Sequence, residues 1–286
     1  MNRIENAFNN KPIFMPYFPL GFPDLDTSID VIEALARNGA DLIEVGLSFS
    51  DPLADGPVIQ KATQVALEKG VTVRKCLEAV REIRRRGVET PLVLMGYYNP
   101  MLAYGLERFV GDAVDAGADG FIIPDLPVEE SDEFMSALSG TTRQGSPVET
   151  QVEGVNRPST THPERSAQDR DLPLIQMLAP TTPNERMEMI ARNARGFVYL
   201  VSVTGVTGER KSISEGLGEL IARVRAHSSV PVCVGFGIST PGQARQVGAL
   251  ADGVIVGSAC VKTIGESEKP VEAAKEFARC FAEALR

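Results

Sequence analysis

A short pattern occurs three times along the chain and constrains the fold more than any other feature. In each copy a helical stretch ends at small residues, a turn containing an aspartate follows, and a run of apolar residues comes next. The copies span residues 38–44, 116–125 and 250–257. This order is typical of a helix that leads into a buried parallel strand. The recurrence therefore predicts a βα unit that the chain uses repeatedly.

Further short apolar segments alternate with helical patterns between these copies. Strands are expected at residues 13–18, 41–47, 91–95, 120–123, 172–178, 196–201, 231–238 and 253–256. Eight similar units in a row favour a closed (β/α)8 TIM barrel, an α/β fold, preceded by a short N-terminal helix. An open, doubly wound sheet is the alternative. We treat residues 1–286 as a single barrel domain.

Local signals also predict how some connections are built. Thr27 and Ser28 are expected to cap the helix after the first strand. Residues 97–100 are expected to form a loop, and residues 128–138 a single helix with acidic residues in its first turn.

Residues 141–171 interrupt the alternation. They are rich in threonine, serine, proline, glutamine and charge, and they show no apolar periodicity. Such a run is typical of a disordered or loosely packed insertion, with a functional lid as the alternative. Because it joins the helix of the fourth unit to the fifth strand, it is expected on the face opposite the functional loops. Deletion of residues 143–169 is therefore predicted to leave the activity largely intact.

Composition limits the partners and the compartment. A formal net charge of −9 argues against nucleic acid or an anionic membrane as partner, although a local phosphate pocket remains possible. The four cysteines are widely spaced and form no CxxC pair, which is typical of core residues in a reducing cytosol. No apolar run approaches the ~20 residues of a membrane span, and the N-terminus has no signal-peptide core. These features predict a soluble, cytoplasmic protein.

An acidic residue, Glu44, stands within the apolar run of the second predicted strand. Burying an unpaired carboxylate costs several kcal/mol, so a buried Glu44 needs a functional reason. A buried carboxyl group beside a pocket has a raised pKa and can exchange protons near neutral pH. The alternative is an edge strand from which Glu44 faces water. The same strand end leads to Asp51 and Asp55, and the fourth strand leads to Asp125.

Glycines follow the seventh and eighth strands, at Gly235, Gly237 and Gly257. Gly257 and Ser258 stand where a helix begins, and free amides at a helix start suit a phosphate. The loop after the sixth strand adds Gly208. Glycines also serve as barrel corners, so each alone is weak evidence. Together they favour a phosphate site.

The sequence lacks the residues that several kinds of catalytic chemistry require at the predicted site. The two histidines, His162 and His227, lie in the polar insertion and near a helix end. No lysine falls within a predicted strand, which weakens a Schiff-base aldolase, and no glycine-rich dinucleotide fingerprint opens a βαβ unit. Carboxylate acid–base chemistry on a phosphorylated substrate remains, without a metal or a cofactor.

Four motifs resemble the signature of the tryptophan synthase α subunit family. They are residues 44–57, 125–131, 205–208 and 235–239, and the agreement extends over nearly the whole chain except 141–171. The resemblance implies cleavage of indole-3-glycerol phosphate to indole and glyceraldehyde 3-phosphate, in L-tryptophan biosynthesis. One departure is Ser48, where proline is expected, which would loosen the second loop slightly.

The resemblance also assigns residues to roles. Glu44 would be the general acid/base, and Asp55 would pair with the indole N–H. The substrate would contact Phe22, Met95, Ile122, Tyr199, Thr207, Phe236 and Ile255. The phosphate would be bound by Gly208, Gly237, Gly257 and Ser258.

The resemblance further implies a partner, a pyridoxal-phosphate β subunit in an α2β2 tetramer. The cofactor would belong to that partner and not to this chain. The face that meets it would include Asp51, Asn99, Pro100 and Met101. Three alternatives stay open: a stand-alone indole-releasing lyase, a weakly active subunit that mainly activates its partner allosterically, and another phosphate-binding barrel enzyme such as an isomerase.

Overall fold

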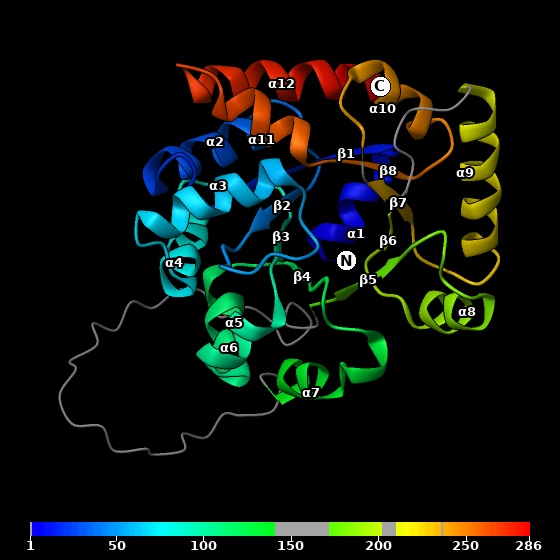
Figure 1. Ribbon diagram of the computed structural model, residues 1–286, viewed down its shortest axis with the longest axis horizontal. Coiled ribbons are helices and arrows are strands. Elements are labelled where there is room, and N and C mark those ends of the chain that lie inside the picture. Colours follow the sequence, from blue (N-terminus) through cyan, green and yellow to red (C-terminus); the bar gives the residue numbers. More distant parts are fainter. Residues whose placement is uncertain (1, 141–171, 202–209, 236) are drawn as a thin grey trace.

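The structure is a computed structural model that describes residues 2–140, 172–201, 210–235 and 237–286. Parallel strands run in sequence order around a closed barrel, with β1 paired to both β2 and β8 (Figure 1). The strands are β1 (Ile13–Pro19), β2 (Ile43–Gly46), β3 (Leu92–Met95), β4 (Gly120–Ile122), β5 (Leu174–Leu178), β6 (Val198–Val201), β7 (Val232–Gly235) and β8 (Gly253–Val256). The pairing of β1 with β8 confirms the TIM barrel and excludes the open sheet.

Helices form the outer ring. They are α2 (Leu25–Arg37), α3 (Pro57–Glu68), α4 (Val73–Arg85), α5 (Tyr98–Tyr104), α6 (Leu106–Ala116), α7 (Asp132–Gly140), α8 (Asn184–Asn193), α9 (Arg210–Arg225), α10 (Pro241–Gly248), α11 (Ser258–Gly265) and α12 (Pro270–Leu285). The predicted N-terminal helix is α1 (Arg3–Ala7), followed by the 3-10 turn η1 (Phe8–Asn10). α1 lies inside the ring in Figure 1, and Ile4 and Phe8 pack with the side chains of the barrel interior.

Three local predictions were wrong. The cap of α2 is Asp24, whose carboxylate accepts the N–H of Thr27 at 2.8 Å, whereas Ser28 is buried one turn further on. Residues 98–100 begin helix α5 instead of a loop, because the first turn of a helix tolerates a proline such as Pro100. Residues 128–138 are divided between the 3-10 turn η2 (Val128–Glu130) and α7, with Ser131 between them.

The aspartate of each repeated segment has a structural role. Asp41, Asp119 and Asp252 stand before β2, β4 and β8, and each accepts a backbone N–H from the neighbouring strand. The donors are Phe14 at 2.8 Å, Leu92 at 2.9 Å and Val232 at 3.0 Å. These bonds satisfy amides at the starts of buried strands, which would otherwise be costly to bury. Each repeated aspartate therefore links its own strand to the neighbouring strand at one end of the barrel.

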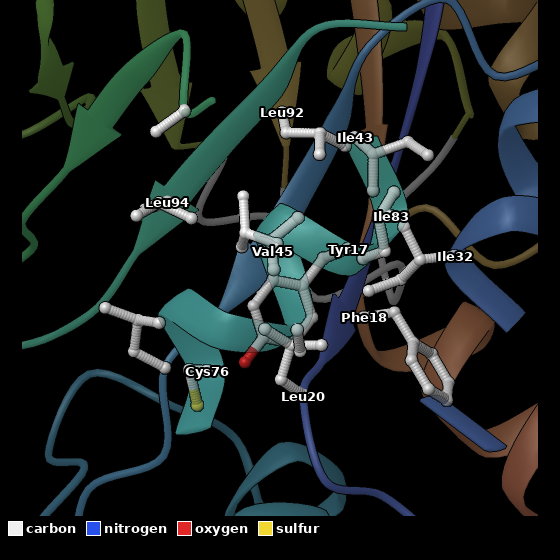
Figure 2. Packing of buried hydrophobic residues seen from close by; sticks show 14 of the residues in the cluster. Tyr17, Phe18, Leu20, Ile32, Ile43, Val45, Cys76, Ile83, Leu92 and Leu94 are labelled. Carbon is white, nitrogen blue, oxygen red and sulfur yellow. The ribbon is translucent and has the colours of Figure 1, made fainter. Parts of the chain in front are cut away.

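Side chains of the strands alternate between two apolar layers. One layer lies between the strands and the helices, and Figure 2 shows part of it, including Ile43, Val45, Leu92, Leu94, Ile32 and Ile83. The other layer fills the barrel and includes Ile13, Met15, Leu42, Val93, Ile122, Ile175, Phe197 and Ile255. Glu44 follows Leu42 by two residues, so it shares the inward face nearer the carboxyl end of β2.

The cysteines are all free thiols. Cys76, Cys233 and Cys260 are buried, as expected for core residues, but Cys280 is exposed on α12. Within the described ranges, no helix is long and apolar enough to cross a membrane.

Candidate active site

A cavity of about 610 Å³ is formed by residues near the carboxyl ends of the strands and by the loops that follow them. Its wall combines inward-facing strand residues with the start of α11. The described lining residues include Tyr17, Glu44, Asp55, Ile59, Met95, Met177, Tyr199, Gly237, Ile255, Gly257, Ser258 and Lys262. The structure therefore brings together both predicted catalytic carboxyl groups and three of the four predicted phosphate-binding residues.

Glu44 is the most perturbed carboxyl group of the cavity. It is only 1% exposed, and among the described residues its Oε1 atom has no hydrogen-bond partner. Burial raises the pKa of Glu44 from 4.5 to about 8, because the charged form loses its hydration. The group is therefore protonated at neutral pH when the cavity is empty. It can donate that proton to a bound ligand and recover it later.

Asp55 lies on the loop before α3 and is less enclosed. Burial raises its pKa, and a hydrogen bond from the Tyr97 hydroxyl opposes that rise. The same hydroxyl accepts the N–H of Ala54 at 2.9 Å, so Tyr97 fixes the loop at two consecutive residues. The cavity thus holds two carboxyl groups with different environments, an arrangement that separates their protonation states.

Ser48 connects this loop to its surroundings. Its hydroxyl donates to the carbonyl of Leu20 at 3.4 Å, and its backbone N–H bonds to the thiol of Cys76. Burial raises the pKa of Cys76 to about 12, and the Ser48 N–H partly offsets that rise. A proline at this position would lack both donors. The contacts argue against the expected loosening of the loop.

Two buried tyrosines stand near Glu44. Tyr17 is the register partner of Glu44 on β1, and Tyr199 projects from β6. Burial, followed by the charges of Asp55 and Glu44, raises the pKa of both phenols well above 10, so both hydroxyls remain protonated donors. Gly46 and Gly235 make room for them. A Cβ atom at Gly46 would approach Tyr17 Cζ to 2.7 Å, and one at Gly235 would approach the Tyr199 hydroxyl to 2.5 Å.

The predicted phosphate site is partly described. Gly257 precedes α11, and Ser258 is its first residue, so the first amides of this helix have no intrahelical partner. Gly237 has a φ of 78°, a left-handed conformation that favours glycine. Thr207, Gly208 and Phe236 lie outside the described residues.

Two residues predicted to contact the substrate are not among the residues that line the cavity. Phe22 packs against Phe18 with ring centroids 6.2 Å apart, close to Gly265, and is not among the cavity-lining residues. Ile122 is 0% exposed in the barrel interior and does not line the cavity either. Tyr17, which was not among the predicted contacts, lines the cavity from β1. The period-two alternation of Ile13, Met15 and Tyr17 was the signal that could have identified it.

Other lining residues that the sequence analysis missed are Ile59, Met177 and Lys262. Asp125, a candidate from the end of β4, has a structural role because its carboxylate accepts the N–H of Tyr98 at 2.9 Å. In the described ranges, no group of three or more histidine, cysteine, aspartate or glutamate residues is arranged to hold a metal ion.

The residues of the predicted partner face differ in how far they are exposed to solvent. Asp51 and Asn99 are exposed and Pro100 is half-buried. Met101, in contrast, is 0% exposed and packs in the core, so its side chain cannot contact a partner in this conformation. Leu53, two residues after Asp51, is 92% exposed and is the most exposed large apolar residue described.

A closed (β/α)8 barrel with two carboxyl groups and a helix start in one cavity defines a TIM-barrel enzyme of the acid–base type, suited to a phosphorylated substrate. Comparison with known proteins identifies the family. Residues 4–143 and 157–286 match the family model described as tryptophan synthase alpha chain, and the protein belongs to that family. The unmatched internal residues, 144–156, fall within the polar segment 141–171.

Individual relatives agree with the family match. The alpha chain of Chloroflexus aggregans is 44% identical over 266 residues, which cover 91% of this chain and 89% of the relative. The alpha chain of Geobacter sulfurreducens is 43% identical over 291 residues, covering 100% and 98%. The crystal structure of tryptophan synthase subunit alpha from Legionella pneumophila has a TM-score of 0.81 and 35% identity, covering 99% of this chain and 98% of that one.

The family defines the reaction. The protein is a lyase that cleaves indole-3-glycerol phosphate to indole and glyceraldehyde 3-phosphate, in tryptophan biosynthesis. The match does not favour the alternative of another phosphate-binding barrel enzyme.

Proposed function

We propose that Glu44 and Asp55 together carry out the proton transfers of this cleavage. The observation that carries the proposal is the buried Oε1 atom of Glu44, which has no partner among the described residues and belongs to a carboxyl group in the cavity wall. Such a group is costly unless a ligand pairs with it. A substrate atom in the cavity would supply that pairing.

The first step requires an acid. Glu44 is protonated near neutral pH because burial raises its pKa to about 8. It donates this proton to the indole carbon that bears the glycerol phosphate chain. The ring then carries positive charge, delocalised onto the ring nitrogen. Asp55, which lines the same cavity, accepts the hydrogen bond of the indole N–H and stabilises that charge.

The second step requires a base. Glu44 is now ionised and takes part in removing the proton from the hydroxyl group on the adjacent side-chain carbon. The bond between that carbon and the ring breaks, and its electron pair restores the aromatic indole. The hydroxyl carbon becomes the aldehyde of glyceraldehyde 3-phosphate. One proton has moved from Glu44 to the ring and one from the hydroxyl to Glu44, so the enzyme returns to its starting state.

The rest of the cavity suits the two halves of the substrate. Met95, Tyr199 and Ile255 offer apolar surface for the indole ring, and Ile59 and Met177 extend it. Gly237, Gly257 and Ser258 surround the start of α11, where the positive end of the helix dipole favours a phosphate. We further propose that Gly208 completes the phosphate site and that Thr207 and Phe236 contact the substrate.

The test is indole release by purified Glu44→Gln and Asp55→Asn chains. Both are expected to lose activity by at least about a hundredfold, a typical effect of losing general acid–base catalysis, while retaining the far-ultraviolet circular dichroism of the unsubstituted chain. Glu78→Gln, on the exposed side of α4, is the matched control and should stay fully active. Undiminished turnover by folded Glu44→Gln would refute the proposal and favour a mainly allosteric subunit.

We also propose that the chain works in the cytoplasm in an α2β2 complex, with pyridoxal phosphate bound to the β subunit. Support comes from the family match, and we expect the loop with exposed Asp51 and Leu53 to take part in the contact. Solved relatives include tryptophan synthase from M. tuberculosis in an aminoacrylate-bound form, at 33% identity and a TM-score of 0.80.

The complex can be tested by size-exclusion chromatography with light scattering, using a β subunit from the same source. A mass equal to two copies of each chain is expected. Leu53→Asp should weaken the complex, and Met189→Asp, which alters another exposed apolar residue on α8, should not. A stand-alone lyase would remain separate from the β subunit and would show unchanged activity in its presence.

A further inference from the structure

Helix α11 presents a charged face to the cavity. Ser258, Lys262 and Glu266 are spaced four residues apart, and all three line the cavity. Residues at this spacing lie on the same side of a helix. The face therefore extends from the helix start, where the phosphate site is proposed, to exposed side chains one and two turns further along.

Lys262 is the only lysine or arginine among the described residues that line this cavity. The ion pairs of lysine side chains in the described ranges are Lys11 with Asp252 and Lys275 with Glu272. Lys262 takes part in neither. Its ammonium group is therefore available to a ligand that enters the cavity.

The balance of charge in the cavity indicates a role for Lys262 in binding a phosphate. Besides the protonated Glu44, the cavity wall contains the carboxyl groups of Asp55 and Glu266, in a chain with a net charge of −9. A phosphate ester adds close to two further negative charges at pH 7, since its second pKa is about 6. A helix start contributes the equivalent of only about half a positive charge. A cation near the phosphate would offset this repulsion.

We propose that Lys262 is a substrate-binding residue that pairs with the phosphate of indole-3-glycerol phosphate on the α11 side of the cavity. The inference rests on the phosphate site of the proposed function and extends it with a side-chain charge. Lys262 contacts the phosphate and not the carbon atoms that react, so it contributes to binding. Glu266, on the next turn of the same face, opposes it by repelling the phosphate.

The experiment measures kcat and KM for indole-3-glycerol phosphate, together with competitive inhibition by inorganic phosphate, in the full chain. Lys262→Gln is expected to raise KM and the inhibition constant of phosphate by about tenfold each, the effect of losing a charge-assisted hydrogen bond, with kcat changed less than twofold. Lys262→Arg should restore both constants. Glu266→Gln should lower both, and raising the ionic strength should weaken each effect.

Lys269→Gln is the matched control, because it removes the same charge from an exposed lysine outside the cavity lining. The inference is overturned if Lys262→Gln leaves both constants within twofold, if it lowers kcat alone, or if Lys269→Gln produces the same increase. Failure of the proposed function looks different: phosphate would not compete with the substrate even in the unsubstituted chain, or Glu44→Gln would retain turnover.

Discussion

Replacing Glu44 with glutamine should stabilise the protein at alkaline pH while it removes the lyase activity. The carboxyl group is 1% exposed and burial raises its pKa from 4.5 to about 8. The folded state therefore holds a proton that the unfolded state has released throughout this pH window. The stabilising contribution of that proton is fully present below pH 4.5, and it is lost as the pH rises toward 8.

The size of this stability change follows from the difference between the pKa of Glu44 in the unfolded and in the folded state. One pH unit corresponds to about 1.4 kcal/mol of differential stability. The gap between 4.5 and about 8 therefore corresponds to roughly 5 kcal/mol lost by the unsubstituted protein. Glutamine has nearly the same shape and does not titrate. The stability of Glu44→Gln relative to the unsubstituted chain should thus rise with pH by up to that amount.

The assay is urea-induced unfolding at pH 5, 6, 7 and 8, followed by circular dichroism, for both proteins. Comparing them at each pH cancels the titration of all other groups. A difference in unfolding free energy that grows with pH supports the reasoning, together with loss of indole release at every pH. A difference that stays constant from pH 5 to pH 8 would show that Glu44 is hydrated or paired, and it would refute the mechanism built on its raised pKa.

Three further perturbations test other parts of the structure. Gly235→Ala places a Cβ atom 2.5 Å from the Tyr199 hydroxyl and should cost about 1–3 kcal/mol in urea unfolding. Gly242→Ala is the control and should not destabilise the protein, because its added Cβ atom would meet no other atom within 4 Å. Asp119→Asn removes a charge that pairs with Arg3 and Arg84 and should cost about 3 kcal/mol in urea unfolding; an unchanged midpoint would contradict the structural role of the repeated aspartates. Deletion of residues 143–169 should change kcat/KM by less than about threefold, since both ends of the segment join the barrel away from the cavity, and a large loss of kcat would reveal a functional role.

Part of the site followed from residue types and their order. Glu44 was identified because a single carboxyl group in an apolar strand needs a functional reason, and Ser258 because it follows a glycine at a predicted helix start. Tyr17 was missed, although it lines the cavity. The register of β1 against β2 places Tyr17 beside Glu44, and this pairing is a tertiary contact that the sequence does not show.

Lys262 illustrates a second limit. In the sequence it is a lysine within a helix, and most such residues face solvent without a role. Its relation to the cavity depends on how α11 is rotated about its own axis, which is set by packing against the neighbouring helices. Met101 shows the converse, because a residue predicted to lie on the partner face proved to be buried within a short helix.

The amino-acid sequence alone determined the repeated βα unit, the barrel and the candidate catalytic carboxyl groups, because periodicity and an isolated charge are local properties of the chain. The tertiary structure decided which side chains share the cavity, what raises the pKa of Glu44, and why Asp41, Asp119 and Asp252 recur. Those properties depend on burial and on contacts between strands that lie far apart in the chain. Enclosure by the whole barrel makes Glu44 an acid at neutral pH.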